Sequence, residues 1–520
     1  MKIAFFSDNY MPGGETLDPF RAQFFKALCR IGGEILYIQS NDFQNPDGGF
    51  LSNRSRDKVL SSLQRFEPEV VISLNRAGLS EAVQKETKAS FLSWYIDNPN
   101  RFSPSLRKFS QGETIFCATK YMCDWLSKSA PEVSCLYLPF CTDEELFSPH
   151  PAVPDSAKCD VSFVGTLWEP SPFLNMVQQM ARTPDGQLLV MQGLNEYLGN
   201  YDSDFPIRLK KIFPEMPLTL IKNTLDDFLS SRRRLDYLEA ISDLDVQIYG
   251  TSSWLGQSVL RSDRLFEKFK PTPLETPEAL ASLYRHSRVA ISIAHQQAQS
   301  GFPIRIFDIL GTGTPLVSDF HRELGDLFED GKCFLAAGSA EEASEAVRRL
   351  IKDTHLAKRM SGAAVDAVRS HHTFAHRLKT MTGKDLGPKG ASVIQLLSDR
   401  LSTDFLISDP RFQLSEIRAL APKRSRTPQR VSAPSPGRAV VGSLNIIKKL
   451  IKIAGLTAYV SILMVKFGLV SLVKRREGSL LKELKRIGEF SENMVRQHQE
   501  SLLIQARTLL VQLSLLKDKN

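Results

Sequence analysis

The sequence predicts an α/β fold made of two successive doubly wound, mostly parallel sheets. Short continuous apolar runs alternate with stretches whose apolar residues recur at helical spacing. Continuous apolar runs are typical of strands buried on both faces, and helical stretches between them are typical of parallel connections. This rhythm restarts after a proline-rich crossing, LPFCTDEELFSPHPAVP, at residues 138–154. Two domains joined by one hinge are therefore expected.

Each predicted element follows from its own run of residues. In the first domain a helix is expected at residues 20–29, and strands at 2–7, 34–39, 69–74, 90–96, 114–118 and 134–138. In the second domain strands are expected at 159–164, 188–192, 245–249, 289–293 and 315–318. Open α/β sheets bind ligands beyond the carboxyl ends of their strands. We therefore expect the functional site where the carboxyl ends of the two sheets face one cleft.

Charge is distributed unevenly along the chain. The 520 residues carry a formal net charge of +8, but residues 421–480 hold 12 Lys and Arg against one acid, Glu477, and the first 420 residues carry −5. A nucleic-acid binder carries its positive charge on the folded domain. No nucleic-acid partner is expected, and DNA binding by the tail alone stays as an alternative. The 42% hydrophobic content excludes a disordered or collagen-like chain.

Cysteine usage and the N-terminus indicate a cytoplasmic protein without a metal. The seven cysteines are odd in number and include no CxxC pair, so neither a zinc site nor a disulfide framework is indicated. The N-terminal MKIAFFSDNY has too short an apolar run for a signal peptide. No acidic DxD-type cluster follows an expected strand, so we expect no metal and no cofactor.

Two glycine-containing loops at strand ends are candidates for phosphate contact. Gly13 and Gly14 lie in SDNYMPGGE, between the first strand and the first helix, and Gly165 closes the run CDVSFVGT. Glycines let backbone N–H groups approach an anion near a helix N-terminus. The alternative for the first loop is a plain surface turn, and for the second a structural bend.

The strongest constellation is SGFPIRIFDILGTGTPLVSDF at residues 300–320. Pro303 is expected to interrupt regular secondary structure, and a helix is expected after it. The glycines at 311 and 313 end this helix before the next strand. Arg305 and Asp308 are three residues apart and share one helix face, where the guanidinium suits a phosphate and the carboxylate suits sugar hydroxyls. The alternative is an ion pair on a solvated face.

At these residues the sequence resembles glycosyltransferases of the GT-B fold, which have two Rossmann-like domains, and the spore-maturation CgeB-like branch in particular. The run at residues 305–320 carries the resemblance, together with ELGDLFEDGKCFL at 323–335 and the helical stretch at 355–378. Further similar motifs are WYIDNP at 94–99 and VQIYGTSSW at 246–254, and the resemblance spans about residues 1–380.

The resemblance implies a hexosyltransferase-type enzyme that moves a sugar from a nucleotide sugar, bound by the second domain, to a glycan, lipid or protein acceptor bound by the first. Asp308 takes the place of the acid, usually Glu, that contacts the donor ribose, and Arg305 matches the arginine near the diphosphate. The donor-binding residues expected on this basis are Gly13, Gly14, Gly165, Gly250, Arg305, Asp308 and Gly313.

Two residues are candidates for catalysis. Asp97, at the end of a first-domain strand, is the expected general base or acceptor-orienting carboxylate, with a turn residue before Asn98 and Pro99 as the alternative. His295 follows a second-domain strand, and its alternative is a structural role. Ser300 stands where the wider retaining class has a second acid, so the stereochemistry stays open. Because Asp replaces Glu and no cation closely follows Gly165, a non-catalytic scaffold is the alternative function.

The chain is expected to divide into an acceptor domain at 1–145, a nucleotide-sugar domain at 146–385, a basic Pro/Ser-rich linker at 386–440 and a helical tail at 441–520. Lysines threaded through the apolar stretch 441–476 share one arc of a helix, which indicates peripheral attachment to the inner face of a membrane. A span at 453–473 and packing on protein are the alternatives. Apolar residues at 4,3,4,3 spacing within 480–516, namely Leu502, Ala506, Leu509, Leu513 and Leu516, suit self-association or folding back.

Overall fold

The computed structural model describes residues 1–8, 19–31, 33–45, 48–99, 109, 112–149, 158–272, 274, 276–387, 393–398 and 417–419. Gly13, Gly14 and the whole tail at 441–520 lie outside these ranges. The two sheets belong to one compact unit, residues 1–253 and 267–423, whereas residues 254–266 belong to a second unit. The latter range holds most of α9 (Ser253–Arg261) and the start of α10 (Asp263–Lys268).

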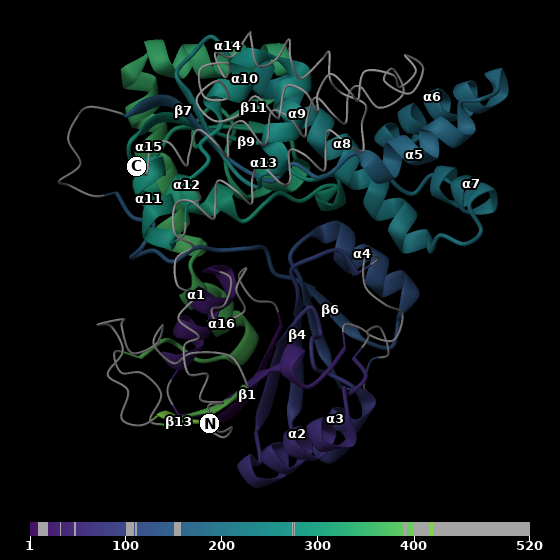
Figure 1. Cartoon of the computed structure of the whole chain (residues 1–520). Coiled ribbons are helices and arrows are strands. Elements are labelled where there is room, and N and C mark those ends of the chain that lie inside the picture. Colours follow the sequence, from purple (N-terminus) through teal and green to yellow (C-terminus); the bar gives the residue numbers. More distant parts are fainter. Residues whose placement is uncertain are drawn as a thin grey trace, which may run out of the picture. The chain divides into compact units, whose positions relative to one another are not determined.

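The first sheet has parallel strands in the order β13-β12-β2-β1-β3-β4-β5-β6 (Figure 1). Its strands are β1 (Lys2–Ser7), β2 (Glu34–Gln39), β3 (Val70–Leu74), β4 (Ser90–Tyr95), β5 (Thr114–Cys117), β6 (Ser134–Tyr137), β12 (Val393–Leu397) and β13 (Ile417–Ala419). The first six confirm the apolar runs predicted in this domain.

Helices cover both faces of this sheet, because successive side chains along its strands pack into two different cores. Ile3 and Phe5 of β1 pack with α1 (Pro19–Cys29) in one core cluster, while Ala4 and Phe6 pack with α2 (Asn53–Phe66) and α3 (Glu81–Glu86) in another. Beyond β5, α4 (Lys120–Ser129) is capped by the Thr119 side chain, which accepts a hydrogen bond from the Met122 N–H. The period of two expected of a sheet buried on both faces is thus present.

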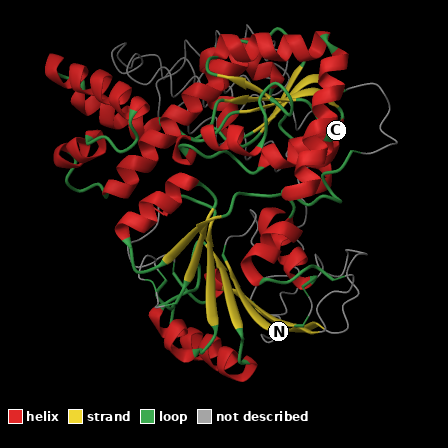
Figure 2. Ribbon diagram, turned by 180° about the vertical axis from the view of Figure 1, so that it is seen from behind, coloured by secondary structure: helices red, strands yellow, loops and turns green. Residues whose placement is uncertain are grey.

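The second sheet has parallel strands in the order β11-β10-β9-β7-β8. Figure 2 shows its strands in yellow with helices around them. The strands are β7 (Cys159–Val164), β8 (Val246–Tyr249), β9 (Ser287–Ser292), β10 (Leu316–Asp319) and β11 (Leu335–Ala337). The helices around it are α11 (Pro277–Arg285), α12 (Arg305–Thr312), α13 (Arg322–Leu327), α14 (Ala340–Lys352) and α15 (Thr354–His371). The predicted α/β fold class with two parallel sheets is confirmed.

Four helices separate β7 from β8, where one strand was predicted at residues 188–192. They are α5 (Ser171–Met180), α6 (Pro184–Gly199), α7 (Phe205–Ile212) and α8 (Leu218–Glu239). The predicted strand was wrong: its residues lie in α6, which starts with a Thr183 cap and Pro184 in its first turn. A short apolar run suits a helix as well as a strand, and these caps decide for a helix.

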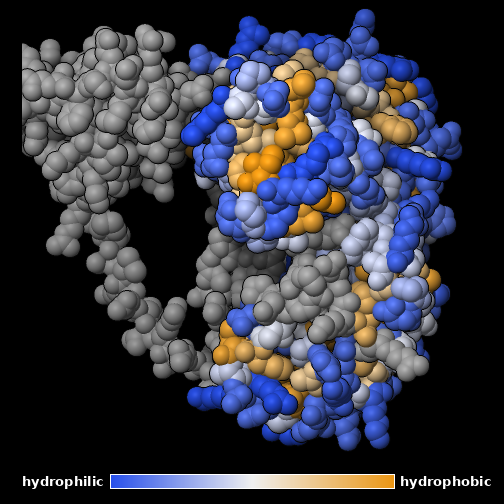
Figure 3. All heavy atoms as spheres, turned by 90° about the vertical axis from the view of Figure 1, so that its right-hand side faces the viewer, coloured by the Kyte–Doolittle hydropathy of each residue, from blue (hydrophilic) through white to orange (hydrophobic). Residues whose placement is uncertain are grey.

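This helical insertion has its own core and an exposed apolar face. Its interior holds Phe173, Tyr197, Phe205 and Leu225, among others. Figure 3 shows apolar side chains gathered on the side of the molecule where the insertion lies. The exposed ones on α5 to α7 are Leu174, Leu188, Met191, Leu198, Ile207 and Ile212. Among the residues that the structure describes, no helix is long and apolar enough to cross a membrane.

The chain returns to the first sheet after completing the second. Phe374, Leu378 and Met381 of α16 (Phe374–Thr382) belong to the same core cluster as α1, and β12 pairs with β2. The structure thus packs α16, within the range predicted for the second domain, and β12, within the range predicted for the linker, with the first sheet. The predicted domain division at 146–385 and 386–440 remains a prediction. Phe374, Leu378 and Met381 bury their apolar side chains in the cluster that holds α1.

Packing inside the insertion predicts opposite effects for two glycines of α6. A Cβ added at Gly193 would lie 2.1 Å from the Phe205 ring, whereas one at Gly199 would meet nothing within 4 Å. Gly193→Ala should lower the free energy of unfolding by about 1–3 kcal/mol through overpacking. Gly199→Ala, the matched control, should be neutral or stabilising by up to about 1 kcal/mol. Denaturant unfolding of both variants measures this, and equal effects would contradict the packing.

Candidate functional site: an arginine cluster at the carboxyl edge of the second sheet

Three neighbouring strands of the second sheet end at one edge. Because β10, β9 and β7 are adjacent and parallel, the loops that follow them lie side by side. These loops are residues 165–168 after β7, 293–299 after β9, which include the short helix η4 (Gln296–Ala298), and 320–321 after β10. The segment that the sequence singled out around Arg305 begins just beyond the β9 loop.

Helix α8 of the insertion holds two of these loops in place. The Ser231 hydroxyl accepts from the Trp168 N–H at 3.0 Å, and the Ser230 hydroxyl accepts from the Gln296 N–H at 2.8 Å. Arg234 donates to the Thr166 carbonyl and twice to the Ile293 carbonyl, at 3.2 and 3.0 Å. One side chain therefore ties the end of β7 to the end of β9.

Arg234 is a buried cation in this arrangement. Its exposed fraction is 3%, and its guanidinium lies 4.8 Å from the centre of the Trp168 ring. Burial, together with the nearby charge of Arg305, lowers the pKa of Arg234 to about 9. The like charges of Arg234 and Arg305 are thus held close together at one strand end. A bound anion would reduce the repulsion between them.

Arg305 is the first residue of α12 and lies against Gly165. A Cβ added at Gly165 would lie 3.1 Å from Arg305 Nη1 and 2.6 Å from the Phe163 ring. Arg305 Nη1 is buried and has no hydrogen-bond partner among the described residues. A buried donor without a partner costs about 1–3 kcal/mol. The glycine leaves room for the guanidinium, which has unused capacity to bind an anion at the N-terminal end of α12.

Gly165 itself contributes space rather than a donor. Its N–H already donates to the Tyr249 carbonyl at 2.9 Å. The Gly165 N–H is therefore not available to donate to a phosphate in this conformation. Gly250 follows Tyr249 at the end of β8 and is exposed. These two predicted residues therefore lie at neighbouring strand ends, and Gly165 and Arg305 are the predicted pair that the fold brings into contact.

Asp308 lies one turn further along α12 and bonds to the segment that joins the sheets. The Thr142 hydroxyl donates to Asp308 Oδ1 at 2.5 Å, and Asp308 is 7% exposed. Burial raises the pKa of Asp308 to about 7, although the Thr142 hydrogen bond and the charge of Arg305 act in the opposite direction. The predicted ribose contact of Asp308 has only Oδ2 left for a ligand.

His295 is held inside the protein rather than directed at a ligand. Its Nε2 lies 3.0 Å from Asp227 Oδ1 on α8, and its Nδ1 accepts from the Gln297 N–H at 3.2 Å. The ring also meets Trp168 edge-on, with centroids 4.4 Å apart. Because Nδ1 accepts, Nε2 carries the proton toward Asp227. Both nitrogens are used, so the structural alternative suits His295 better than a catalytic role.

Asp97 follows β4 in the first domain, and only one side chain is bonded to its carboxylate among the described residues. Asn75 Nδ2 donates to Asp97 Oδ2 at 3.0 Å. The next residue, Asn98, is buried and donates to the Gln297 carbonyl at 3.5 Å. Asp97 therefore lies one residue from a contact with the loop that carries His295, as expected for a residue facing the second sheet.

Gly313 has a structural explanation. It caps α12 with φ 75°, a left-handed conformation that glycine adopts without strain. It lies at the end of α12 opposite Arg305, so its predicted role in donor binding has no support from its position. Gly13 and Gly14 lie outside the described residues, and their predicted role remains a prediction.

Sequence reasoning missed Arg233 and Arg234. Both belong to the run RRR at 232–234, which resembles an ordinary solvated stretch of helix. Arg233 donates to the Ala294 carbonyl at 2.8 Å and lies 3.4 Å from Asp319 Oδ2. Burial alone would raise the pKa of Asp319, but His321 and Arg233 outweigh it and lower that pKa. An arginine run inside an amphipathic helix was the available signal.

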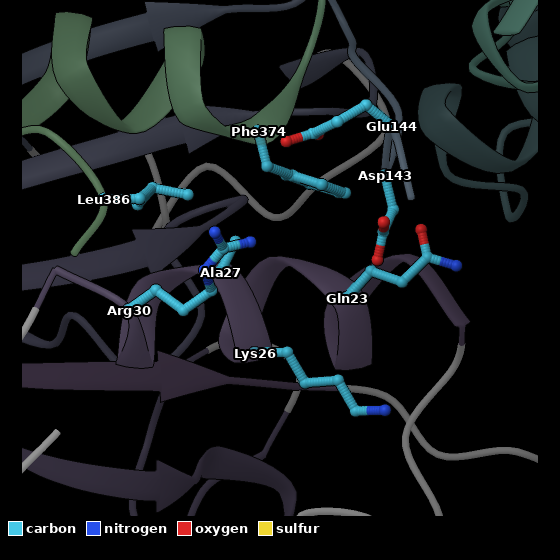
Figure 4. A pocket seen from close by; sticks show the side chains of 8 residues that line it. All are labelled: Gln23, Lys26, Ala27, Arg30, Asp143, Glu144, Phe374 and Leu386. Atoms are coloured by element: carbon cyan, nitrogen blue, oxygen red, sulfur yellow. The ribbon is translucent and has the colours of Figure 1, made fainter. Parts of the chain in front are cut away.

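A small hollow lies elsewhere, beside the segment that joins the sheets. Figure 4 shows α1 side chains and two acidic residues of the joining segment around it. It is lined by Gln23, Lys26, Ala27, Arg30, Asp143, Glu144, Phe374 and Leu386. Its volume of about 20 Å³ suits roughly one water molecule, so it is too small for a sugar. Within the described ranges, no group of three metal-binding side chains occurs.

A comparison with protein families assigns the part of the chain that carries the arginine cluster. Residues 232–383 match a family described as glycosyl transferase-like. The match starts within α8 and includes Arg233, Arg234, Arg305 and Asp308. It supports the general resemblance; no match was found among curated proteins.

Three solved structures illustrate the similarity to proteins of known structure. Sucrose-phosphate synthase from Thermosynechococcus elongatus is 12% identical, with a TM-score of 0.47 over 73% of this chain and 97% of that one. HepE from Anabaena, in complex with UDP and glucose, is 12% identical, with a TM-score of 0.45 over 74% and 98%. A glycosyltransferase from Rickettsia africae is 11% identical, with a TM-score of 0.40 over 73% and 96%.

The raised pKa of Asp308 predicts a pH-dependent stability. The unfolded carboxyl titrates near pH 4 and the folded one near 7, so between these values the folded state binds more protons and the free energy of unfolding falls as pH rises. Asp308→Asn should remove this loss, so its stability relative to the wild type should be greater at pH 8 than at pH 5, by about 2–3 kcal/mol.

Urea unfolding at both pH values measures the effect. Asp353→Asn is the control, because Asp353 is an exposed N-cap of α15 and Asn caps a helix equally well. If Asp308→Asn and Asp353→Asn change with pH in parallel, the assignment of the raised pKa is wrong.

Proposed function

We propose that this protein is a glycosyltransferase that moves a sugar from a nucleoside-diphosphate sugar to a hydroxyl acceptor. The supporting observation is the buried, unpartnered Nη1 of Arg305 against Gly165, inside the glycosyltransferase-like segment. A diphosphate offers the charged acceptor oxygens that this guanidinium lacks, and charge-assisted hydrogen bonds of this kind are the strong ones.

The arginine cluster suits stabilisation of a leaving group. As the sugar departs, negative charge accumulates on the diphosphate oxygen, and a fixed positive group stabilises that charge most when it is already in place. Arg305 supplies the donor, while Arg234 adds a nearby positive charge that its own bonds to carbonyl oxygens do not neutralise. Asp308 Oδ2 then has the role of receiving a ribose hydroxyl.

Asp97 is the proposed base of the reaction. Asp97 accepts the proton of the acceptor hydroxyl as that oxygen bonds to the anomeric carbon. The bond from this carbon to the diphosphate breaks, and its electron pair leaves with the nucleoside diphosphate. Asp97 is the acidic group at the end of β4 whose neighbour Asn98 contacts the β9 loop. His295 supports the β9 loop in this scheme and takes no part in proton transfer.

We also propose that the donor is a hexosyl nucleotide and that the acceptor is a glycan, a lipid or a protein. We propose further that the protein belongs to the CgeB-like branch, is located in the cytoplasm and self-associates through residues 480–516. We propose in addition that residues 441–476 attach the enzyme to a membrane surface. The basic and apolar composition of 421–480 supports this, because basic residues near anionic lipid contribute about 1 kcal/mol each.

Loss of Arg305 should weaken nucleotide binding without unfolding the protein. Arg305→Ala is expected to weaken the affinity for the preferred nucleoside diphosphate by about 10- to 100-fold, the worth of a charge-assisted hydrogen bond. Calorimetry with UDP, GDP, ADP and dTDP measures this. Arg288→Ala is the control, because Arg288 pairs with Asp160 at an exposed position.

Two results would contradict the proposal. Unchanged affinity in Arg305→Ala would show that the guanidinium does not meet the nucleotide. A wild-type protein that binds none of the four nucleotides, and releases no nucleoside diphosphate from any nucleotide sugar, would favour the non-catalytic scaffold instead.

Membrane attachment has a separate test. The full chain should float with vesicles of phosphatidylcholine and phosphatidylserine and should release at high salt, since the attraction is partly electrostatic. A chain ending at residue 420 should stay with the soluble fraction. Equal flotation of the two chains would refute attachment through the tail.

A further inference from the structure

The loop after β3 has an unusual backbone for residues that are not glycine. Asn75 has φ 53° and Arg76 has φ 55°, followed by Gly78 at φ 79°. The left-handed region is strained for a residue with a side chain and persists only where the surroundings enforce it. Asn tolerates this region better than most residues, whereas Arg does not. Two such residues in succession therefore require strong local support.

Buried charge provides that support. Arg76 is fully buried and forms two hydrogen bonds with Glu113, at 2.7 and 2.9 Å. The Ser93 hydroxyl donates to Glu113 as well, at 2.7 Å, and the Phe109 ring lies 4.7 Å from the guanidinium. A buried ion pair becomes very costly when one partner moves away. The pair thus locks the backbone conformation of the loop.

The locked conformation directs the Asn75 side chain onto Asp97. Asn75 Oδ1 accepts from the N–H groups of Ile96 and Asp97, at 2.9 and 3.0 Å. Asn75 Nδ2 donates to Asp97 Oδ2 at 3.0 Å. One amide therefore fixes both the backbone and the carboxylate of Asp97. Among the described residues, no hydrogen bond engages the other carboxylate oxygen, Oδ1.

We propose that Asn75 is a positioning residue for sugar transfer, which holds the Asp97 carboxylate by Oδ2 so that Oδ1 faces the acceptor hydroxyl. This inference rests on the proposed function and adds the residue that orients its base. The strain at Asn75 and Arg76 is then part of the site: it holds a neutral amide where a carboxylate needs a fixed hydrogen-bond donor.

Two substitutions at one position separate positioning from folding. Asn75→Gly keeps the left-handed backbone and removes the amide. It should lower kcat for release of nucleoside diphosphate by about 100-fold, the scale of general-base catalysis. The affinity for the nucleoside diphosphate, measured by calorimetry, should stay within twofold of the wild type, because the arginine cluster is untouched.

Asn75→Asp keeps the size and replaces the amide with a second carboxylate facing Asp97. The acid limb of its pH profile for kcat/KM should move up by about one pH unit, because a neighbouring negative charge disfavours ionisation. Among the described residues, the titratable groups that adjoin the Asn75–Asp97 contact are the Arg76–Glu113 ion pair behind the loop and the hydrogen-bonded His295 and Asp227 beyond Asn98. Both pairs are the same in wild type and variant.

Glu67→Gly is the matched control, since Glu67 also has a left-handed backbone, φ 50°, at the end of α2. It should leave kcat and the pH profile unchanged. Wild-type kcat in Asn75→Gly together with a wild-type pH profile in Asn75→Asp would overturn the inference and leave the proposed function standing. A wild-type enzyme that releases nucleoside diphosphate from no nucleotide sugar would overturn both.

Discussion

The candidate site depends on the bonds between the buried Arg234 guanidinium and the carbonyl oxygens of Thr166 and Ile293. They fix the ends of β7 and β9 relative to each other with a buried cation, whose charge Asp319 partly offsets. Arg305 adds a second positive charge at the same edge, close enough to lower the pKa of Arg234. The fold thereby gathers arginine side chains at this edge, an arrangement that suits the binding of an anion.

The insertion α5 to α8 connects this edge to the rest of the protein. Its last helix, α8, contacts the strand-end loops with five side chains. Asp227 bonds to His295, Ser230 and Ser231 accept from loop N–H groups, and Arg233 and Arg234 donate to carbonyl oxygens. Its first three helices carry exposed apolar side chains. The sequence predicted one strand at residues 188–192 in this stretch, and α8, the helix that holds the strand-end loops, was not predicted. In the first domain, Asn75 fixes the Asp97 carboxylate through a single amide.

Sequence reasoning identified the fold class and half of the site for clear physical reasons. Buried parallel strands leave continuous apolar runs, and the spacing of Arg305 and Asp308 places both on one helix face. It failed where different structures share one pattern: residues 188–192 suit a buried helix as well as a strand, and an arginine run suits solvent as well as a strand-end clamp. Asn75 left no linear signal, because its role depends on a left-handed backbone and on hydrogen bonds across 22 residues. Gly313 has a structural explanation because it ends α12 in a left-handed conformation, and its predicted role in donor binding remains a prediction.

The pairing of β12 with β2 also affects how the chain folds during its synthesis. The first sheet receives its β12 strand, at residues 393–397, only after the entire second sheet has been synthesised. Until then the edge of β2 has unpaired N–H and C=O groups, and the core around Phe24 lacks Phe374 and Leu378. Exposed strand edges template association with other chains. Pairing over such a long sequence separation is slow. The nascent N-terminal half is therefore most prone to aggregation while the ribosome is still translating the glycosyltransferase-like segment.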